Sequence, residues 1–189
     1  MISSRFFGEV FYDEIYKPVK ELGKLGTVID LGACTGEFSL WAYPQAEKIY
    51  AVECNKQVYE SLKENVSDFP NIKPVFLAIS GENGEKVVFD EYIGGSKIAK
   101  EHNEVINRVQ SKTLATFIKE NDIDQIDCLK IDVEGVEKEI FEAEDIISVL
   151  PKIKYIIGEH FNSDEQEIFF KNNGFSFDRY EYGFIIKRI

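Results

Sequence analysis

The stretch VIDLGACTGEF, residues 28–38, brings together the residue types that hold a nucleotide at the end of a β-strand. A short apolar run ends with Asp30 and a leucine, and Gly32 and Gly36 then enclose a short A-C-T tripeptide. An apolar run followed by a glycine-rich turn is typical of the strand, loop and helix that open a nucleotide-binding domain. The loop could hold a dinucleotide, a nucleotide phosphate or a nucleoside without a phosphate.

The phosphate alternatives require residues that this loop lacks. A dinucleotide motif, G-x-G-x-x-G, starting at Gly32 needs further glycines where the sequence has Cys34 and Glu37. A P-loop needs Gly-Lys where the sequence has Glu37 and Phe38. In the first turn of a helix the Glu37 carboxylate complements the helix dipole but repels a phosphate. The loop therefore favours a ligand without a pyrophosphate.

A second acid stands at the end of the next predicted strand. Residues 48–53, KIYAVE, end in Glu53, and an acid at this position accepts the hydroxyls of a ribose in α/β nucleoside-binding folds. A ribose next to Asp30, Glu37 and Glu53 indicates a nucleoside that carries positive charge. S-adenosylmethionine, with its sulfonium and ammonium groups, fits this description. A tight turn with a surface acid is the structural alternative.

The elements that must position these residues follow an alternating β and α pattern. Near-continuous apolar runs, typical of parallel strands covered on both faces, occur at 27–31, 48–53, 73–79, 126–132 and 154–159. Helical periodicity separates them, with Asn55 as an N-cap, Ser163 and Gln166 as a capping box, and Gly174 as a C-terminal stop. The pattern predicts an α/β fold: a Rossmann-like, doubly wound and mostly parallel sheet.

Three further segments complete a single predicted domain that spans residues 1–189. Residues 174–189 predict an antiparallel hairpin that closes the sheet. Residues 85–112 predict a small two-stranded insertion after the third strand. Residues 1–26 predict an N-terminal helical segment that is interrupted at Pro18.

Composition and charge disfavour several functional classes. The chain has 22 basic and 34 acidic residues, a formal net charge of −12, and no basic run that could bind nucleic acid. Its three cysteines are widely spaced and it has two histidines, so neither a disulfide framework nor a zinc site is expected. No apolar run has the length of a transmembrane helix, and the first residues lack the features of a secretory signal. A cytoplasmic protein without a membrane partner is therefore expected.

Two stretches of the sequence resemble a known enzyme family. VIDLGACTGEFSLWA with VECNKQVYESLKENV resembles the class I S-adenosylmethionine-dependent methyltransferases. KTLATFIKENDIDQIDCLKIDVEGVEKEIFEAE, followed by YIIGEHF, more narrowly resembles the FkbM methyltransferase family, and the K-I-D-V-E-G-V-E run at 130–137 is its most specific part. The resemblance implies a seven-stranded sheet and methyl transfer from S-adenosylmethionine to a hydroxyl oxygen, often on a sugar or natural product.

The resemblance also implies roles for individual residues around the cofactor. Asp30 and the two glycines would hold the methionine end and Glu53 the ribose, while Cys54 and the turn at 78–80 would flank the adenine. The predicted cofactor-binding residues, which include the acid after the fourth strand, are Asp30, Gly32, Ala33, Cys34, Gly36, Glu53, Cys54, Ala78, Ile79, Ser80 and Asp132.

The run LKIDVEGVE, residues 129–137, places charges in a central strand. Lys130 and Asp132 point to one face of that strand, where charges are costly unless they are paired. One account holds Lys130 in an ion pair and has Asp132 cap the helix that follows Gly135. The other places Asp132 at the carboxyl edge of the sheet, where it contacts the cofactor ammonium or orients the acceptor hydroxyl.

The fifth predicted strand ends at the same edge, in Glu159 and His160. His160 is suited to take a proton from a hydroxyl near neutral pH, although a structural loop histidine is the alternative. The predicted catalytic residues are therefore Asp132, Glu159 and His160. No spacing in the sequence demands a metal ion.

The sequence as a whole predicts an O-methyltransferase that acts on a hydroxyl of a small molecule or glycan. Candidates for the acceptor side are the loop 93–104 and four N-terminal aromatic residues: Phe6, Phe7, Phe11 and Tyr12. Three alternatives stay open: a nicotinamide-dinucleotide-dependent oxidoreductase, a domain that binds the cofactor without turnover and regulates a partner, and an RNA methyltransferase, which the net charge disfavours.

Overall fold

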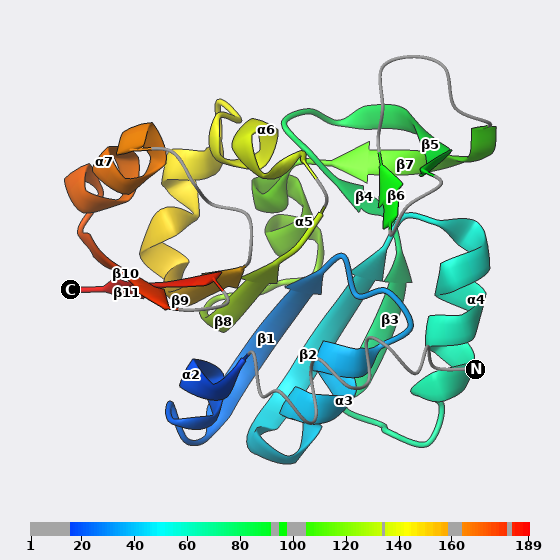
Figure 1. The fold of residues 1–189 in the computed structure, drawn as a ribbon, viewed down its shortest axis with the longest axis horizontal. Helices are drawn as coiled ribbons and strands as arrows, with labels where there is room; N and C mark the ends of the chain where they lie inside the picture. The colour runs from blue at the N-terminus through cyan, green and yellow to red at the C-terminus, as the bar shows by residue number, and fades with distance from the viewer. Residues whose placement is uncertain (1–15, 92–94, 98–104, 134, 159–163, 181–182) are drawn as a thin grey trace.

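The apolar runs of the sequence form a seven-stranded sheet with the strand order β10-β11-β9-β8-β1-β2-β3 (Figure 1). The computed structural model describes residues 16–91, 95–97, 105–133, 135–158, 164–180 and 183–189. The strands of the sheet are β1 (Leu25–Leu31), β2 (Ala46–Glu53), β3 (Ile72–Phe76), β8 (Ile126–Ile131), β9 (Ile153–Gly158), β10 (Phe175–Tyr180) and β11 (Gly183–Arg188). β1 pairs in parallel with β2 and β8, whereas β11 is antiparallel to β9 and β10. The predicted mostly parallel sheet with its antiparallel C-terminal hairpin is confirmed.

Helices cover both faces of this sheet (Figure 1). They are α2 (Lys17–Lys20), α3 (Glu37–Ala42), α4 (Lys56–Asn65), α5 (Leu114–Glu120), α6 (Glu137–Phe141) and α7 (Asp164–Asn172), with short 3-10 helices η1 (Tyr43–Gln45), η2 (Ile146–Ser148) and η3 (Leu150–Lys152). Ile29 and Leu31 pack in the core shared with α5, α6 and α7, whereas Val28 packs in the core shared with α2, α3 and α4. Successive strand residues thus alternate between two buried faces, which explains why the strands are almost entirely apolar.

Local sequence signals set the ends of several helices. Asn55 is the N-cap of α4, and its side chain accepts hydrogen bonds from the N–H groups of Gln57 and Val58 at 2.9 and 3.4 Å. Gly174 follows α7 with a φ of +81°, a conformation that glycine adopts without strain. Pro18 lies in the first turn of α2, and the helical segment predicted before it lies outside the described residues. A proline is tolerated there because the N–H that it lacks has no partner within the helix.

The insertion after the third strand forms part of a second, four-stranded sheet with the order β4-β7-β5-β6. Its strands are β4 (Ala78–Ile79), β5 (Gly84–Glu91), β6 (Gly95–Lys97) and β7 (Val105–Lys112). The two predicted strands correspond to β5 and β7, which pair antiparallel around a small core of Ala78, Val88 and Val109. No helix within the described ranges is long and apolar enough to cross a bilayer.

The predicted strand at 73–79 is in fact two strands in two different sheets. The Leu77 N–H donates to the Glu53 carbonyl at 3.1 Å, and the chain then leaves the main sheet, so that Ala78 and Ile79 pair with Ser111 and Lys112 in β7. The apolar run is continuous because the side chains of Leu77, Ala78 and Ile79 are all buried. Apolar continuity indicates burial and carries no information about which sheet buries the residue.

Several predicted features lie outside the described residues. They are the segment 1–15 with its aromatic side chains, the capping position Ser163, most of the loop 93–104, and the candidate catalytic residues Glu159 and His160. Their roles stay predictions from the sequence.

Candidate functional site

The glycine loop turns sharply at the carboxyl end of β1. Gly32, Cys34 and Gly36 have φ angles of +74°, +50° and +104°, and the N–H groups of Gly32 and Ala33 donate to the Val52 carbonyl at 3.1 and 3.0 Å. The loop is therefore fixed by hydrogen bonds to the end of β2. A non-glycine residue with positive φ is uncommon, and Cys34 adopts it because its N–H is held by another group of the site.

Both glycines are required by close packing against other parts of the chain. A Cβ at Gly32 would lie 1.8 Å from the carbonyl oxygen of Asp132, which no side chain can tolerate. A Cβ at Gly36 would lie 3.0 Å from Leu62 and 3.2 Å from Val66 in and just after α4. The glycines thus let the loop lie against the end of β8 and against α4, and this packing brings the acids of three strands to one edge of the sheet.

A buried ion pair supports the loop from below. Lys130 is 4% exposed, and its Nζ lies 3.2 Å from Oδ1 of the fully buried Asp30 and donates to the Gly32 carbonyl at 2.8 Å. The other carboxylate oxygen of Asp30 accepts a hydrogen bond from the Ser39 hydroxyl at 2.7 Å. Lys130 is therefore ion-paired as expected. Because Asp30 has no exposed surface, it acts on the loop through Lys130 and Ser39.

Asp132 lies on the open side of the same ion pair. Its Oδ2 is 3.9 Å from the Lys130 Nζ, and its side chain keeps a quarter of its surface exposed. It does not cap the following helix, because the N-cap of α6 is Val136, which makes no side-chain capping bond. The turn is held by Glu137 instead, whose carboxylate accepts the N–H groups of Val133 and Gly135 at 3.2 and 2.9 Å. Asp132 is thus left with a partly exposed carboxylate at the edge of the site.

Glu53 joins the glycine loop to the turn that follows β2. Its Oε2 accepts the Cys34 N–H at 3.0 Å, and its Oε1 accepts the N–H groups of Cys54 and Asn55 at 2.9 and 2.8 Å. The side chain is buried, and this burial raises the pKa of the carboxyl above its usual value, although the three N–H groups oppose the shift. An ionised carboxylate offers about four acceptor positions, so Oε2 retains one for a further donor.

The thiols of Cys34 and Cys54, next to Glu53, are unreactive near neutral pH. Burial raises the pKa of both Cys34 and Cys54 to about 12, and the neighbouring Glu53 carboxylate adds to the shift of each. The thiols are therefore neutral near pH 7 and are poor nucleophiles and poor metal ligands. None of the three cysteines forms a disulfide, as the sequence led us to expect.

The turn at 78–80 forms a buried wall beside Glu53. Ser80 has no exposed surface, and its hydroxyl forms a 2.7 Å hydrogen bond with that of Ser111. The two hydroxyl oxygens lie 3.2 and 3.0 Å from the Glu82 carbonyl, so one hydroxyl donates to the other and the second donates to this carbonyl. Ala78 and Ile79 are also buried. Within the described residues the Ser80 side chain is thus bonded to the second sheet.

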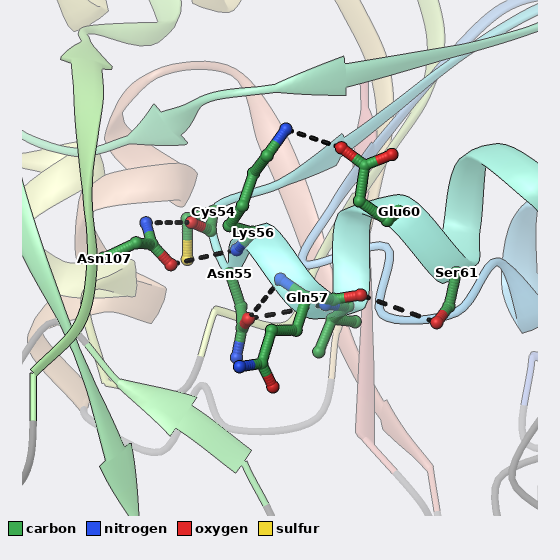
Figure 2. A network of polar contacts seen from close by, with 8 residues as sticks. Cys54, Asn55, Lys56, Gln57, Glu60, Ser61 and Asn107 are labelled. Atoms are coloured by element: carbon green, nitrogen blue, oxygen red, sulfur yellow. Dashed lines mark hydrogen bonds and ion pairs between the residues drawn. The ribbon is translucent and has the colours of Figure 1, made fainter.

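One residue of the site was missed by the sequence analysis. Asn107 of β7 accepts the Lys56 N–H on Oδ1 at 2.9 Å and donates from Nδ2 to the Cys54 carbonyl at 3.1 Å (Figure 2). It thereby bonds the second sheet to the turn beside Glu53. The only signal in the sequence is an asparagine inside a predicted strand, where this residue type is disfavoured.

The arrangement suits a nucleoside that carries no phosphate. Glu37, in the first turn of α3, is buried and bonded to the Thr35 hydroxyl, so the helix N-terminus that would receive a phosphate already holds a carboxylate. Glu53 presents a buried carboxylate acceptor of the kind that binds a ribose hydroxyl. Across the part of the chain that the structure describes, no group of three or more His, Cys, Asp or Glu residues could hold a metal ion.

Comparison with protein-family models agrees with this geometry. The model described as the methyltransferase FkbM domain matches residues 30–187, which include every described residue of the site. No curated protein sequence matches the chain significantly.

Solved structures of methyltransferases share the fold at low sequence identity. TrmK from M. capricolum, in complex with S-adenosylhomocysteine, is 13% identical with a TM-score of 0.54, over 99% of this chain and 67% of TrmK. Precorrin-6y C5,15-methyltransferase from Geobacter metallireducens is 14% identical with a TM-score of 0.53, over 92% and 85% of the two chains. An rRNA methylase from Streptococcus thermophilus is 11% identical with a TM-score of 0.51, over 100% and 99%.

Proposed function

The chain belongs to the FkbM methyltransferase family and uses S-adenosylmethionine, and we propose that it methylates a hydroxyl oxygen of a small molecule or sugar. The observation that carries the proposal is the buried Glu53 carboxylate between the glycine loop and the turn after β2, with one acceptor position left on Oε2. This acceptor would bind a ribose hydroxyl of the cofactor. The residue roles that follow are part of the same proposal.

The other residues of the loop fit the remaining parts of the cofactor. The backbone from Gly32 to Gly36 holds the methionine end, and the partly exposed Asp132 carboxylate faces the cofactor ammonium. The buried side of the adenine pocket is formed by Cys54 and the turn at 78–80. Lys130 is paired with Asp30 and bonded to the Gly32 carbonyl. The carboxyl edge of the sheet therefore stays acidic and attracts a cationic ligand.

Methyl transfer requires mainly that the protein position the acceptor relative to the cofactor. Bound S-adenosylmethionine supplies an already activated methyl group, so the chain must align the acceptor oxygen and exclude water. Asp132 lies at the edge where it can orient a hydroxyl as well as the ammonium. His160, at the end of the neighbouring strand in the sequence, is proposed to take the hydroxyl proton as the new bond forms.

The charge of the chain supports a small acceptor over RNA. An RNA-binding surface needs clustered basic residues, whereas this chain has a net charge of −12 and acids on the strands that form the site. The similarity to an rRNA methylase is at 11% identity and reaches no further than the fold.

Thermal unfolding with three ligands tests the cofactor site. At about a hundred times the dissociation constant, a ligand that binds the native state alone adds about 2.7 kcal/mol, which for a domain of this size raises Tm by roughly 5 to 10 °C. We expect this rise with S-adenosylmethionine and S-adenosylhomocysteine and none with NADH. A rise with NADH alone would overturn the proposal in favour of the oxidoreductase alternative, and no rise with any ligand would mean that this chain has lost its cofactor site.

Transfer of a radiolabelled methyl group then tests the acceptor class. The enzyme is incubated with labelled S-adenosylmethionine and, separately, with pools of sugars, hydroxylated small molecules and bulk RNA. An alkali-stable label on a sugar or small molecule is the expected product of hydroxyl methylation, whereas an alkali-labile label would indicate a carboxyl ester. If bulk RNA is methylated at low salt and this methylation is abolished at moderate salt, the acceptor is nucleic acid rather than a sugar or small molecule.

A further inference from the structure

We propose that Asn107 is a positioning residue for the cofactor, which holds the turn after β2 in the conformation that Glu53 needs. The proposal rests on the proposed ribose contact of Glu53 and extends it to a residue of the second sheet. Asn107 itself touches backbone atoms of the turn, so it acts through Glu53.

The side-chain amide of Asn107 uses both of its ends on one short segment. Its Nδ2 donates to the carbonyl of Cys54, and its Oδ1 accepts the N–H of Lys56, so the amide spans the peptide groups on both sides of Asn55 (Figure 2). Two hydrogen bonds from one planar group fix both the position and the orientation of this turn.

The clamped segment is the one that orients Glu53. The N–H groups of Cys54 and Asn55 are the two donors to Oε1 of Glu53, at 2.9 and 2.8 Å. If the turn were free to rotate, Oε1 would lose these donors and Oε2 would keep only the Cys34 N–H. Asn107 therefore preorganises the carboxylate, and preorganisation of a binding group appears in affinity rather than in the chemical step.

The second sheet is built in a way that places Asn107 at this point. The register between β5 and β7 shifts by one residue between the pairs Val88–Asn107 and Phe89–Val105. Such bulges bend a strand and re-aim a neighbouring side chain, and they occur often next to functional sites. The insertion thus does more than extend the fold, because it reaches back to the turn beside the cofactor site.

The test compares Asn107→Ala, which removes contacts to the turn after the carboxyl end of β2, with Asn71→Ala, which removes a contact to the amino end of β2. Asn71 donates from Nδ2 to the carbonyl of Ala46, the first residue of β2, at 2.8 Å. Binding of S-adenosylhomocysteine is measured by calorimetry on both variants, after circular dichroism has shown that each is folded. We expect the dissociation constant to rise about tenfold in Asn107→Ala, as loss of two hydrogen bonds allows, and to stay within twofold of wild type in Asn71→Ala.

A double-mutant cycle with the ligand separates positioning from a general loss of structure. 2′-Deoxy-S-adenosylhomocysteine lacks a ribose hydroxyl and is expected to bind wild type more weakly than the parent ligand. Because Asn107→Ala has already loosened Glu53, removal of the hydroxyl should cost at least threefold less affinity in this variant than in wild type or in Asn71→Ala. A purely structural asparagine would leave that ratio unchanged, and such a result would overturn the proposal.

Two further measurements distinguish failure of the proposed function from failure of the role proposed for Asn107. Asn107→Asp keeps the acceptor for the Lys56 N–H but places a second oxygen against the Cys54 carbonyl, so it should bind at least as weakly as Asn107→Ala and serves as the test if the alanine variant does not fold. If wild type fails to bind S-adenosylhomocysteine, the proposed function fails. If wild type and Asn107→Ala bind it equally while Glu53→Gln does not, only the role of Asn107 is overturned.

Discussion

Each edge of the central sheet has a carboxylate that accepts backbone N–H groups from a neighbouring segment, yet the two carboxylates differ in charge balance. At the amino edge, Asp127 of β8 accepts the N–H groups of Gly26 and Thr27 at 2.8 and 3.1 Å and pairs with Lys154 of β9. At the carboxyl edge, Glu53 accepts three N–H groups and forms no ion pair with a described residue.

The difference separates a structural carboxylate from a binding one. The charge of Asp127 is balanced by Lys154, which is half exposed, so the pair needs nothing more. Glu53 is buried without a directly paired cation, and burial raises its pKa although the charge of Lys130 partly opposes the shift. A buried carboxylate with an acceptor position to spare is costly to the fold and useful to a ligand, since a ligand hydroxyl can complete its hydrogen bonds.

The largest expected effect is the loss of stability in Gly32→Ala compared with Gly26→Ala. The new Cβ at position 32 would lie 1.8 Å from the Asp132 backbone, and φ is +74°, so we expect a loss of about 4 kcal/mol or more. At position 26 the Cβ would lie 2.7 Å from the end of the Asp127 side chain, which can shift at the cost of its hydrogen bonds to the N–H groups of Gly26 and Thr27. That variant should lose about 2 kcal/mol. Urea unfolding monitored by circular dichroism measures both, and equal losses would contradict the packing described here.

Replacing the buried lysine should reduce stability far more than replacing the exposed one. Lys130→Met leaves the charge of the fully buried Asp30 without its ion pair, and we expect it to lose about 3 kcal/mol or more in stability. Lys154→Met removes a partner that is half exposed and should lose less than about 1 kcal/mol. A loss in Lys130→Met no larger than that in Lys154→Met would contradict the role given to the buried pair.

Replacement of Glu53 should weaken the binding of S-adenosylhomocysteine, whereas replacement of Asp127 should not. Glu53→Gln removes the charge and turns an amide N–H toward donors that need an acceptor, so the dissociation constant should rise about 10- to 100-fold. Asp127→Asn should lower stability slightly and leave the dissociation constant within twofold. Calorimetry on the two variants is the measurement, and a weakened Asp127→Asn with an unchanged Glu53→Gln would reverse the assignment of roles.

The site residues that could be predicted from the sequence are charged residues within or at the ends of apolar strands. An acid at the end of the second strand predicts a ribose contact for Glu53, and the cost of an unpaired charge in a central strand predicts an ion pair for Lys130. The role of Asp30 at the cofactor follows from the family resemblance. The sheet itself followed from apolar runs and helical periodicity, and the seven-stranded order agrees with the family resemblance.

Contacts between distant segments could not be predicted from local pattern. Asn107 meets the turn at 54–56 across about fifty residues of sequence, and nothing near it marks that partner. The same holds for the strand predicted at 73–79, which is divided between two sheets by the pairing of Ala78 with Ser111. Local periodicity reports which residues are buried, whereas the partner that buries them depends on tertiary packing.

The smallest expected effect is the pH dependence of Glu53, and it acts in opposite directions on binding and on stability. Burial raises the pKa of this carboxyl above the ordinary value of 4.5. The ionised form accepts the ribose hydroxyl, so affinity for S-adenosylhomocysteine should be full above the folded pKa and fall by up to about tenfold per pH unit below it. Glu53→Gln should lack this dependence.

Stability follows the opposite sign because the folded state favours the protonated carboxyl. With a folded pKa above the unfolded one, the native protein binds more protons between the two values, so the contribution of Glu53 to stability is lost as pH rises from about 4.5 through the folded pKa. Relative to Glu53→Gln, the ligand-free wild type should therefore become less stable over the pH range in which it binds the ligand more tightly. Urea unfolding and calorimetry on the same samples measure both quantities. If both rose together with pH, burial would not raise the pKa of Glu53, and the contrast between the two edges would disappear.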